Sequence, residues 1–195
     1  MVLLFSFRSS VADWYYVPTG SMEPTIQVGD RVVVDKSAYT LELPFTDVVV
    51  AKTGNINRGD IVIIDSNAAD TRLIKRVVAI EGDKVKLENN VLFINGEKAT
   101  LSVKGHNLYS EQILGQTRTI ALNPLPSPAK NFNLITVPRD HVLAMGDNRN
   151  NSVDSRYYGF IPIEEIQGKA NAVAFSLDTK NMYLPRKERF FTSLY

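Results

Sequence analysis

The sequence predicts a mostly β protein built from antiparallel sheets. Short runs of β-branched and other apolar residues recur along the chain, and glycine, asparagine, aspartate and proline separate them. Helix is expected only as short turns, one of them near residues 162–166. The 195 residues are enough for one domain of medium size, or for a domain with a smaller insert.

Nine segments have the length and composition of β-strands. In chain order they are residues 31–35, 48–52, 60–64, 73–80, 84–87, 91–94, 134–137, 142–145 and 172–177. Turn sequences lie between them, such as Asn-Arg-Gly-Asp at 57–60, Glu-Gly-Asp at 81–83 and Asn-Gly at 95–96. This spacing favours consecutive strands that pair as hairpins.

Residues 98–133 differ from the segments on either side. They are polar, contain Gly105 and Gly115, and end in a proline-rich run at 123–128. A loop-like stretch of this length inside a compact fold indicates an inserted subdomain or cap. We therefore expect an N-terminal segment at 1–13, a core made of 14–97 and 134–195, and an insert at 98–133.

Composition excludes several functional classes. The net charge of +1 gives no bulk reason to expect a nucleic-acid partner. Cysteine is absent, only two histidines occur, and the sequence has neither HExxH nor a P-loop, so no metal or cofactor is expected. The apolar stretch 1–7 is shorter than the roughly 20 residues of a membrane span. We expect it to be the stub of a spanning helix that begins upstream, or else a frayed terminus.

Ser21 lies in a turn that could present a nucleophile. Pro18 and Pro24 fix φ on either side of it, and Gly20 permits a conformation that other residues resist. The N–H of Ser21 and the hydroxyl of Thr19 could bind a developing oxyanion. Taken alone, a serine in such a turn is equally an ordinary turn residue.

Lys75 could accept the proton of such a serine if it were neutral. Leu73, Val77 and Ala79 share its strand parity and are apolar, so its side chain would be desolvated. A fall from a pKa of ~10.4 to about 7–8 corresponds to roughly 3–4 kcal/mol against the charged form, which burial can supply. Parity leaves two alternatives open, because Arg76 also lies between apolar neighbours and both cations could extend to solvent.

A dense polar loop, residues 146–159, follows the apolar strand 142–145. If it folds beside Lys75, Ser152 could orient the lysine nitrogen, and Asp154 with Arg156 could form an ion pair that holds the loop. The alternative is a solvated surface loop. His106 and His141 are rival bases, since Ser-His-Asp is the commoner hydrolase device, but a structural role is favoured for His141.

Four segments together resemble one family, the bacterial type I signal peptidases or leader peptidases. They are PTGSMEPTI (18–26), RGDIVII (58–64), RLIKRVVAIEGDKV (72–85) and PRDHVLAMGDNRNNSVDSRYYGFIP (138–162). The resemblance implies an antiparallel β-sheet core of the coiled-barrel type, with a small β-rich insert between the lysine segment and the polar loop.

The resemblance also implies a role for each matched residue. Ser21 is similar to the nucleophile, and Lys75 to the general base that later returns the proton to the leaving amine. Ser152 matches the position that orients the lysine, and Asp154 and Arg156 match the supporting pair. Thr19 falls where many members carry serine, and its hydroxyl is still an oxyanion donor. The residues that resemble the lining of the small substrate pockets are Val17, Met22, Ile26 and Ile74, for which core packing is the alternative.

The expected function is cleavage of signal peptides from secreted preproteins after small residues, of the Ala-x-Ala type. The resemblance places such an enzyme in the cytoplasmic membrane with its catalytic domain on the outer face, and we expect a monomer. Residues 14–16 (Trp-Tyr-Tyr) and the basic, aromatic tail at 185–191 could contact lipid, or could pack inward. Two alternatives are a specialised pilin-processing or conjugative-transfer peptidase and a catalytically silent β-domain that only binds.

Overall fold

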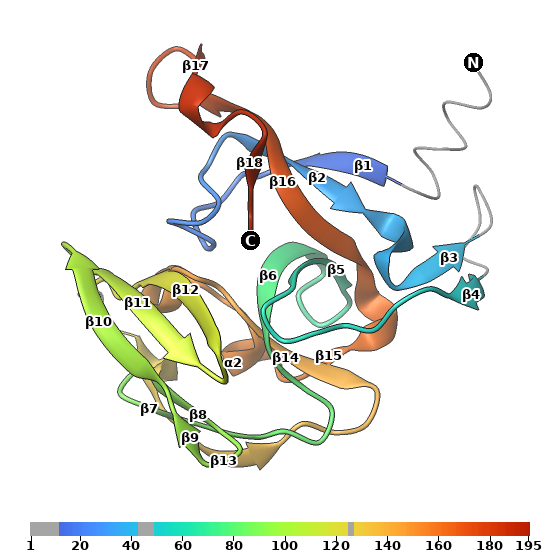
Figure 1. The fold of residues 1–195 in the computed structure, drawn as a ribbon, viewed down its shortest axis with the longest axis vertical. Helices are drawn as coiled ribbons and strands as arrows, with labels where there is room; N and C mark the ends of the chain where they lie inside the picture. The colour runs from blue at the N-terminus through green and yellow to red at the C-terminus, as the bar shows by residue number, and fades with distance from the viewer. Residues whose placement is uncertain (1–11, 43–48, 125–126) are drawn as a thin grey trace.

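The computed structural model describes residues 12–42, 49–124 and 127–195, and most of them lie in antiparallel sheets (Figure 1). The largest sheet has nine strands. Its hydrogen-bonded order is β1 (Ala12–Tyr16), β2 (Asp30–Asp35), β16 (Ile166–Asp178), β5 (Ile61–Ser66), β6 (Thr71–Ile80), β14 (His141–Met145) and β15 (Ile161–Pro162), and β17 (Leu184–Pro185) and β18 (Thr192–Ser193) also pair with β16. Strands from both ends of the chain therefore meet in one sheet.

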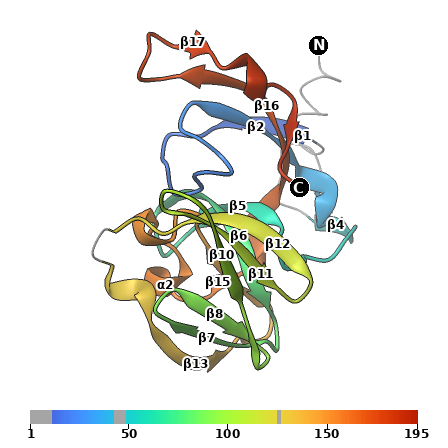
Figure 2. The same ribbon diagram turned by 60° about the vertical axis from the view of Figure 1, so that its left-hand side comes forward.

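Three smaller sheets complete the described part of the fold. A four-stranded sheet has the order β13 (Phe132–Thr136), β7 (Lys84–Glu88), β8 (Val91–Ile94) and β9 (Glu97–Lys98). A three-stranded sheet contains β10 (Thr100–Gly105), β11 (Leu108–Ile113) and β12 (Gln116–Ala121), and β3 (Thr40–Glu42) pairs with β4 (Val49–Lys52). In both views, the three- and four-stranded sheets lie at the opposite end of the molecule from β17 (Figures 1 and 2).

Helical structure in the described residues is limited to single turns. The one α-helix, α2, spans Ser155–Tyr158. The 3₁₀ turns are η1 (Lys36–Ala38), η2 (Pro128–Lys130), η3 (Arg149–Asn151), η4 (Ile163–Glu165) and η5 (Lys187–Arg189). The turn expected near residues 162–166 is η4.

Apolar side chains join the sheets into continuous cores. One cluster packs residues of β2 and β16 against the turn that follows β1. Another joins β6 and β14 of the large sheet to β7 and β8 of the four-stranded sheet. Ile74 of β6 also packs against the first cluster. Because β6 contacts both clusters, this strand is held in a fixed position between them.

The predicted fold class is confirmed, and all nine predicted segments are strands. Their ends differ by a few residues, and β16 begins six residues earlier than the predicted start at 172. The residue pattern of 98–133 indicated a loop, whereas the resemblance implied a β-rich insert, and the structure has strands β10–β12 there. β10 alternates polar and apolar residues over Thr100–Lys104, but the alternation is short and five of the six residues of the strand are exposed.

The structure bears only in part on the expected membrane anchor and on the expected domain boundaries. No helix among the described residues is long and apolar enough to cross a membrane. The expected anchor stub falls mostly on residues 1–11, which lie outside the described residues. The division into a core and an insert at 98–133 stays a prediction.

Candidate active site

Ser21 lies in the turn that connects β1 to β2, here called the nucleophile turn (residues 18–26). The ends of this connection are closed by Val17 N–H, which donates to Asp30 O at 2.9 Å, and by Gly29 N–H, which donates to Val17 O at 3.0 Å. Within it, Glu23 N–H donates to Gly20 O at 3.1 Å. The short, internally bonded turn holds Ser21 in a nearly buried position, 8% exposed.

The nucleophile turn is also tied to the polar loop (residues 146–159) from far along the chain. The Asn148 N–H donates to Ser21 O, and the Asn148 side-chain amide donates to Gly20 O, both at 3.0 Å. The hydroxyl of Thr25 donates to Asp147 Oδ2 at 2.6 Å. The position of Ser21 therefore depends on the loop as well as on its own turn.

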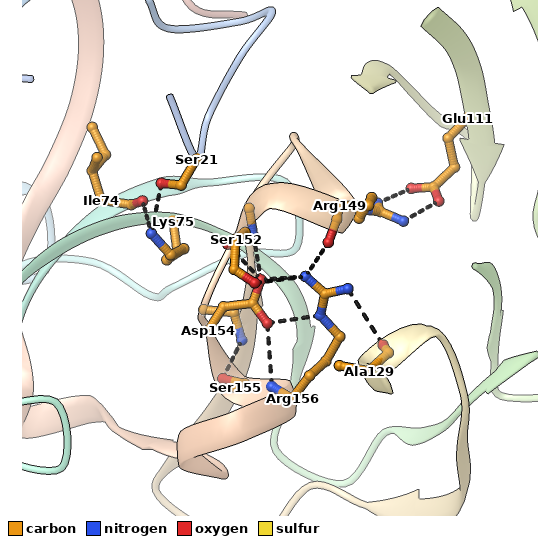
Figure 3. A network of polar contacts seen from close by, with 12 residues as sticks. Ser21, Ile74, Lys75, Glu111, Ala129, Arg149, Ser152, Asp154, Ser155 and Arg156 are labelled. Atoms are coloured by element: carbon orange, nitrogen blue, oxygen red, sulfur yellow. Dashed lines mark hydrogen bonds and ion pairs between the residues drawn. The ribbon is translucent and has the colours of Figure 1, made fainter. Parts of the chain in front are cut away.

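Lys75 reaches Ser21 from β6. Its Nζ lies 2.9 Å from Ser21 Oγ and donates to Ile74 O at 2.9 Å (Figure 3). Burial lowers the pKa of Lys75 to about 8, and Asp154, which raises it, only partly offsets this. A neutral amine at this distance can accept the proton of the serine hydroxyl.

The neighbouring cation, Arg76, is also buried, at 6% exposed, but it has other hydrogen-bond partners than Lys75. Its Nε and Nη2 donate to the two oxygens of Asp147 at 2.8 and 2.7 Å, and Nη1 donates to Gly59 O at 2.8 Å. Burial lowers the pKa of Arg76, but the Asp147 carboxylate outweighs this effect and holds the pKa above its usual value. No carboxylate among the described residues forms an ion pair with Lys75, so only Lys75 can become neutral near physiological pH.

The polar loop folds back on itself around Asp154. Ser152 Oγ donates to Asp154 Oδ2 at 2.7 Å, and the Gly146 N–H donates to the same oxygen at 2.9 Å. Arg156 donates to both carboxylate oxygens, at 2.8 and 2.7 Å, so the expected ion pair is present. Burial raises the pKa of Asp154, but the hydrogen bonds and charge of Arg156 outweigh this effect and hold the pKa below its usual value. The loop is buried here rather than solvated.

Ser152 differs from the expectation in its bonding partner. The sequence suggested a hydrogen bond to the Lys75 nitrogen, but in the described structure the Ser152 hydroxyl donates to Asp154 instead. The carboxylate is the stronger acceptor because it is charged. A role for Ser152 in orienting Lys75 stays a prediction.

Sequence reasoning assigned no role to Gly146, which lies between two functional atoms. A Cβ at this position would be 2.3 Å from Ser152 Oγ and 2.4 Å from Ser21 O, so a side chain would push the loop and the nucleophile turn apart. Asn148 was missed in the same way. The signal available in the sequence was the Gly-Asp-Asn run directly after a buried strand.

The two expected oxyanion donors remain available. Thr19 is exposed, and neither its hydroxyl nor the Ser21 N–H makes a hydrogen bond within the described part of the chain. The expected pocket residues Val17, Met22 and Ile26 lie together in one apolar cluster, and each is at most 1% exposed. Ile74 packs against this cluster and is only partly buried. A role for these four residues in substrate binding stays a prediction.

Three other features of the described residues take no part in the contact between Ser21 and Lys75. His141 Nδ1 lies 2.7 Å from Arg139 O, and neither histidine bonds to Ser21. No group of three or more His, Asp or Glu side chains in these residues could hold a metal ion. A cavity of about 760 Å³ lies between β12 and residues 193–195, but neither Ser21 nor Lys75 lines it.

Comparison with known proteins assigns the family. The family model described as signal peptidase, peptidase S26 matches residues 1–175. The chain belongs to the signal peptidase family. As a member of the family, it is a serine endopeptidase.

Individual signal peptidases show the extent of the similarity. The chain is 33% identical to a signal peptidase I of Pseudomonas aeruginosa over 214 residues, which cover 97% of this chain and 74% of that protein. It is 33% identical to a signal peptidase IB of Staphylococcus aureus over 170 residues, which cover 87% of this chain and 81% of that protein. A crystal structure of a signal peptidase I from Enterococcus faecalis matches with a TM-score of 0.40 and 25% identity, covering 59% of this chain and 96% of that one.

Proposed function

We propose that this protein removes signal peptides from secreted preproteins, with Ser21 as the nucleophile and Lys75 as the general base. The observation that carries this proposal is the 2.9 Å distance between Ser21 Oγ and Lys75 Nζ in a buried site where the lysine has no carboxylate partner among the described residues. Family membership supports the preprotein substrate.

The reaction follows from the positions of these groups. Lys75 takes the proton of Ser21 as Oγ attacks the carbonyl carbon before the cleaved bond, and the oxyanion receives hydrogen bonds from the Ser21 N–H and the Thr19 hydroxyl. Lys75 then gives this proton to the departing amine, which leaves an acyl-enzyme. A water molecule attacks the acyl group with Lys75 again as the base, which releases the cleaved signal peptide and restores Ser21.

The specificity part of the proposal is cleavage after small residues of the Ala-x-Ala type. Partly buried Ile74 borders the apolar cluster next to Ser21 and Lys75, and Val17, Met22 and Ile26 in that cluster are at most 1% exposed. A small substrate side chain beside Ile74 would displace these packed residues least. The substrate would bind as an extended strand along the catalytic sheet, so that backbone hydrogen bonds supply affinity and the pockets supply selectivity.

The location part is a catalytic domain on the extracytoplasmic face of the cytoplasmic membrane, acting as a monomer against the lipid surface. Trp14 and Tyr16 are 53% and 47% exposed and share one face of β1. Exposed amphipathic rings of this kind are favoured at the level of the lipid headgroups.

The test is cleavage of a preprotein with an Ala-x-Ala site in lipid vesicles. Ser21→Ala and Lys75→Ala should abolish cleavage, whereas Lys52→Ala, which removes an exposed lysine, should not. An acylating inhibitor should label Ser21 only in proteins that retain Lys75. Wild-type rates in Ser21→Ala or Lys75→Ala would overturn the assignment of these two residues. Cleavage of a single pilin among many preproteins would favour a specialised role.

The pH dependence is a second test. With a Lys75 pKa of about 8, roughly a tenth of the free enzyme carries a neutral lysine at pH 7. The value of kcat/KM should therefore rise about tenfold per pH unit up to pH 8 and level off above it. A profile that is flat from pH 6 to 9 would exclude Lys75 as the base.

A further inference from the structure

The three-stranded sheet β10–β12 contacts the polar loop. The Ala121 N–H donates to Asp147 O at 2.9 Å, and the Asn123 side-chain amide donates to Asn148 Oδ1 at 2.8 Å. The Asn150 side-chain amide donates to Asn123 O at 2.6 Å. The end of β12 therefore borders the part of the loop that bonds to the nucleophile turn.

A buried ion cluster adds to this contact. Glu111, on β11, is fully buried and accepts hydrogen bonds from Arg149 Nη1 at 2.7 Å and Nη2 at 2.6 Å. Arg118, on β12, donates its Nε to Glu111 at 2.6 Å. Burial raises the pKa of Glu111, but the two guanidinium groups outweigh this effect and lower the pKa to about 2. The carboxylate is thus charged throughout the physiological range.

Arg149 occupies a central place in the polar loop. Its neighbour Asn148 bonds to the nucleophile turn, and its own carbonyl oxygen accepts a hydrogen bond from Arg156 Nη2 at 2.7 Å (Figure 3). The same Arg156 holds Asp154, which in turn accepts from Ser152. A displacement of Arg149 would therefore reach both the nucleophile turn and the groups beside Lys75.

The cluster is poorly suited to a role in stability alone. Two arginines share one carboxylate, and Arg118 Nη2 and Arg149 Nε are buried without a hydrogen-bond partner within the described part of the chain. Buried ion pairs stabilise little once desolvation is counted, whereas a bidentate arginine–carboxylate pair fixes geometry in two directions.

We propose that Glu111 is a positioning residue, which holds the polar loop against the nucleophile turn through Arg149, and that the sheet β10–β12 serves as a scaffold for the active site. This inference rests on the proposed function only where cleavage is the readout. It gives the insert a task in catalysis without contact to the substrate.

The cluster contains its own matched control. Arg118 and Arg149 bond to the same carboxylate, but only Arg149 belongs to the loop. Arg118→Met leaves a balanced Glu111–Arg149 pair, and kcat should stay within about twofold of wild type. Glu111→Gln and Arg149→Met should each lower kcat at least tenfold with KM changed less than twofold. The double variant should be no worse than either single one, because both act through one contact.

Two further readouts separate positioning from general structure. In Glu111→Gln the looser loop should admit water to Lys75, so the midpoint of the kcat/KM profile should move upward from that of wild type. Amide hydrogen exchange at residues 146–154 should be faster than in wild type or in Arg118→Met. The exchange measurement needs no substrate, so it tests the positioning role even if the preprotein substrate is wrong. Failure of the wild-type protein to cleave any preprotein would refute the proposed function separately.

Unchanged kcat and unchanged exchange in a folded Glu111→Gln protein would overturn the proposal, and so would equal losses in Arg118→Met and Arg149→Met. If Glu111→Gln does not fold, the triple variant Glu111→Met, Arg118→Met, Arg149→Met removes all three buried charges together. That variant should fold with at least tenfold lower kcat and with faster exchange in the loop. Full activity with wild-type exchange, or failure to fold, would show that the cluster does not position the loop.

Discussion

Replacement of Lys75 by methionine should stabilise the folded protein at neutral pH while it abolishes cleavage. The lysine is 4% exposed, and burial lowers its pKa from 10.5 to about 8. This difference corresponds to about 3 kcal/mol of unfavourable free energy when the folded protein must carry a charged Lys75, since each pKa unit corresponds to about 1.4 kcal/mol. Methionine has a similar length and carries no charge, so it avoids that penalty.

The pH dependence of this effect has a definite sign. Below pH 8, Lys75 is protonated in both the folded and the unfolded states, so its contribution is constant and unfavourable. Between about pH 8 and 10.5 the unfolded chain binds more protons than the folded protein, and the stability of wild type therefore rises with pH. Above 10.5 the amine is neutral in both states and the penalty is gone.

Urea unfolding of the two proteins from pH 7 to 10.5 checks this reasoning. The variant should be more stable by up to about 3 kcal/mol at pH 7, and the difference should shrink across the upper part of the range. Lys180→Met, which removes an exposed lysine, controls for the loss of a surface cation. A variant less stable than wild type by an amount independent of pH would show that Lys75 is not desolvated in the folded state.

Three other substitutions test single contacts. Gly146→Ala should lower kcat by about a hundredfold, because the added methyl would lie 2.3 Å from Ser152 Oγ and would displace the loop beside Ser21. Steady-state cleavage near the wild-type rate would contradict this packing. Asp147→Asn should lower the free energy of unfolding by about 3–5 kcal/mol, because it leaves the buried Arg76 guanidinium without a carboxylate, and a loss below 1 kcal/mol in urea unfolding would argue against a buried charge pair. Thr19→Val should lower kcat by about 10²–10³ with KM little changed, whereas Thr19→Ser should stay active; equal kcat for Val and wild type would remove Thr19 from the oxyanion site.

The fold could be predicted wherever residue chemistry is local. Strand β6, for example, is rich in β-branched residues and ends in a continuous apolar run, and the Glu-Gly-Asp turn at 81–83 follows it. The strands β10–β12 gave a weaker signal because polar side chains occupy many of their positions. Glu111 is buried in β11 because Arg149, 38 residues away, neutralises it, and no local pattern shows that partner.

The candidate site divides in the same way. The turn and strand patterns around Ser21 and Lys75 made both residues candidates, and the resemblance of their segments to one family implied their roles. The partner of Ser152 and the close packing of Gly146 were not predictable, because both depend on how the polar loop folds against the nucleophile turn.

By itself, the sequence determined the fold class, nine of the strands, the turns between them, the family and the residue types able to do the chemistry. Only the tertiary structure decided which of two neighbouring cations loses its charge. Arg76 binds Asp147, 71 residues along the chain, and stays charged, whereas Lys75 is buried beside Ser21 and pairs with no carboxylate in the described part of the chain. The physical reason is that desolvation and charge interactions depend on distance in space, and a strand pattern specifies only the face on which a side chain lies.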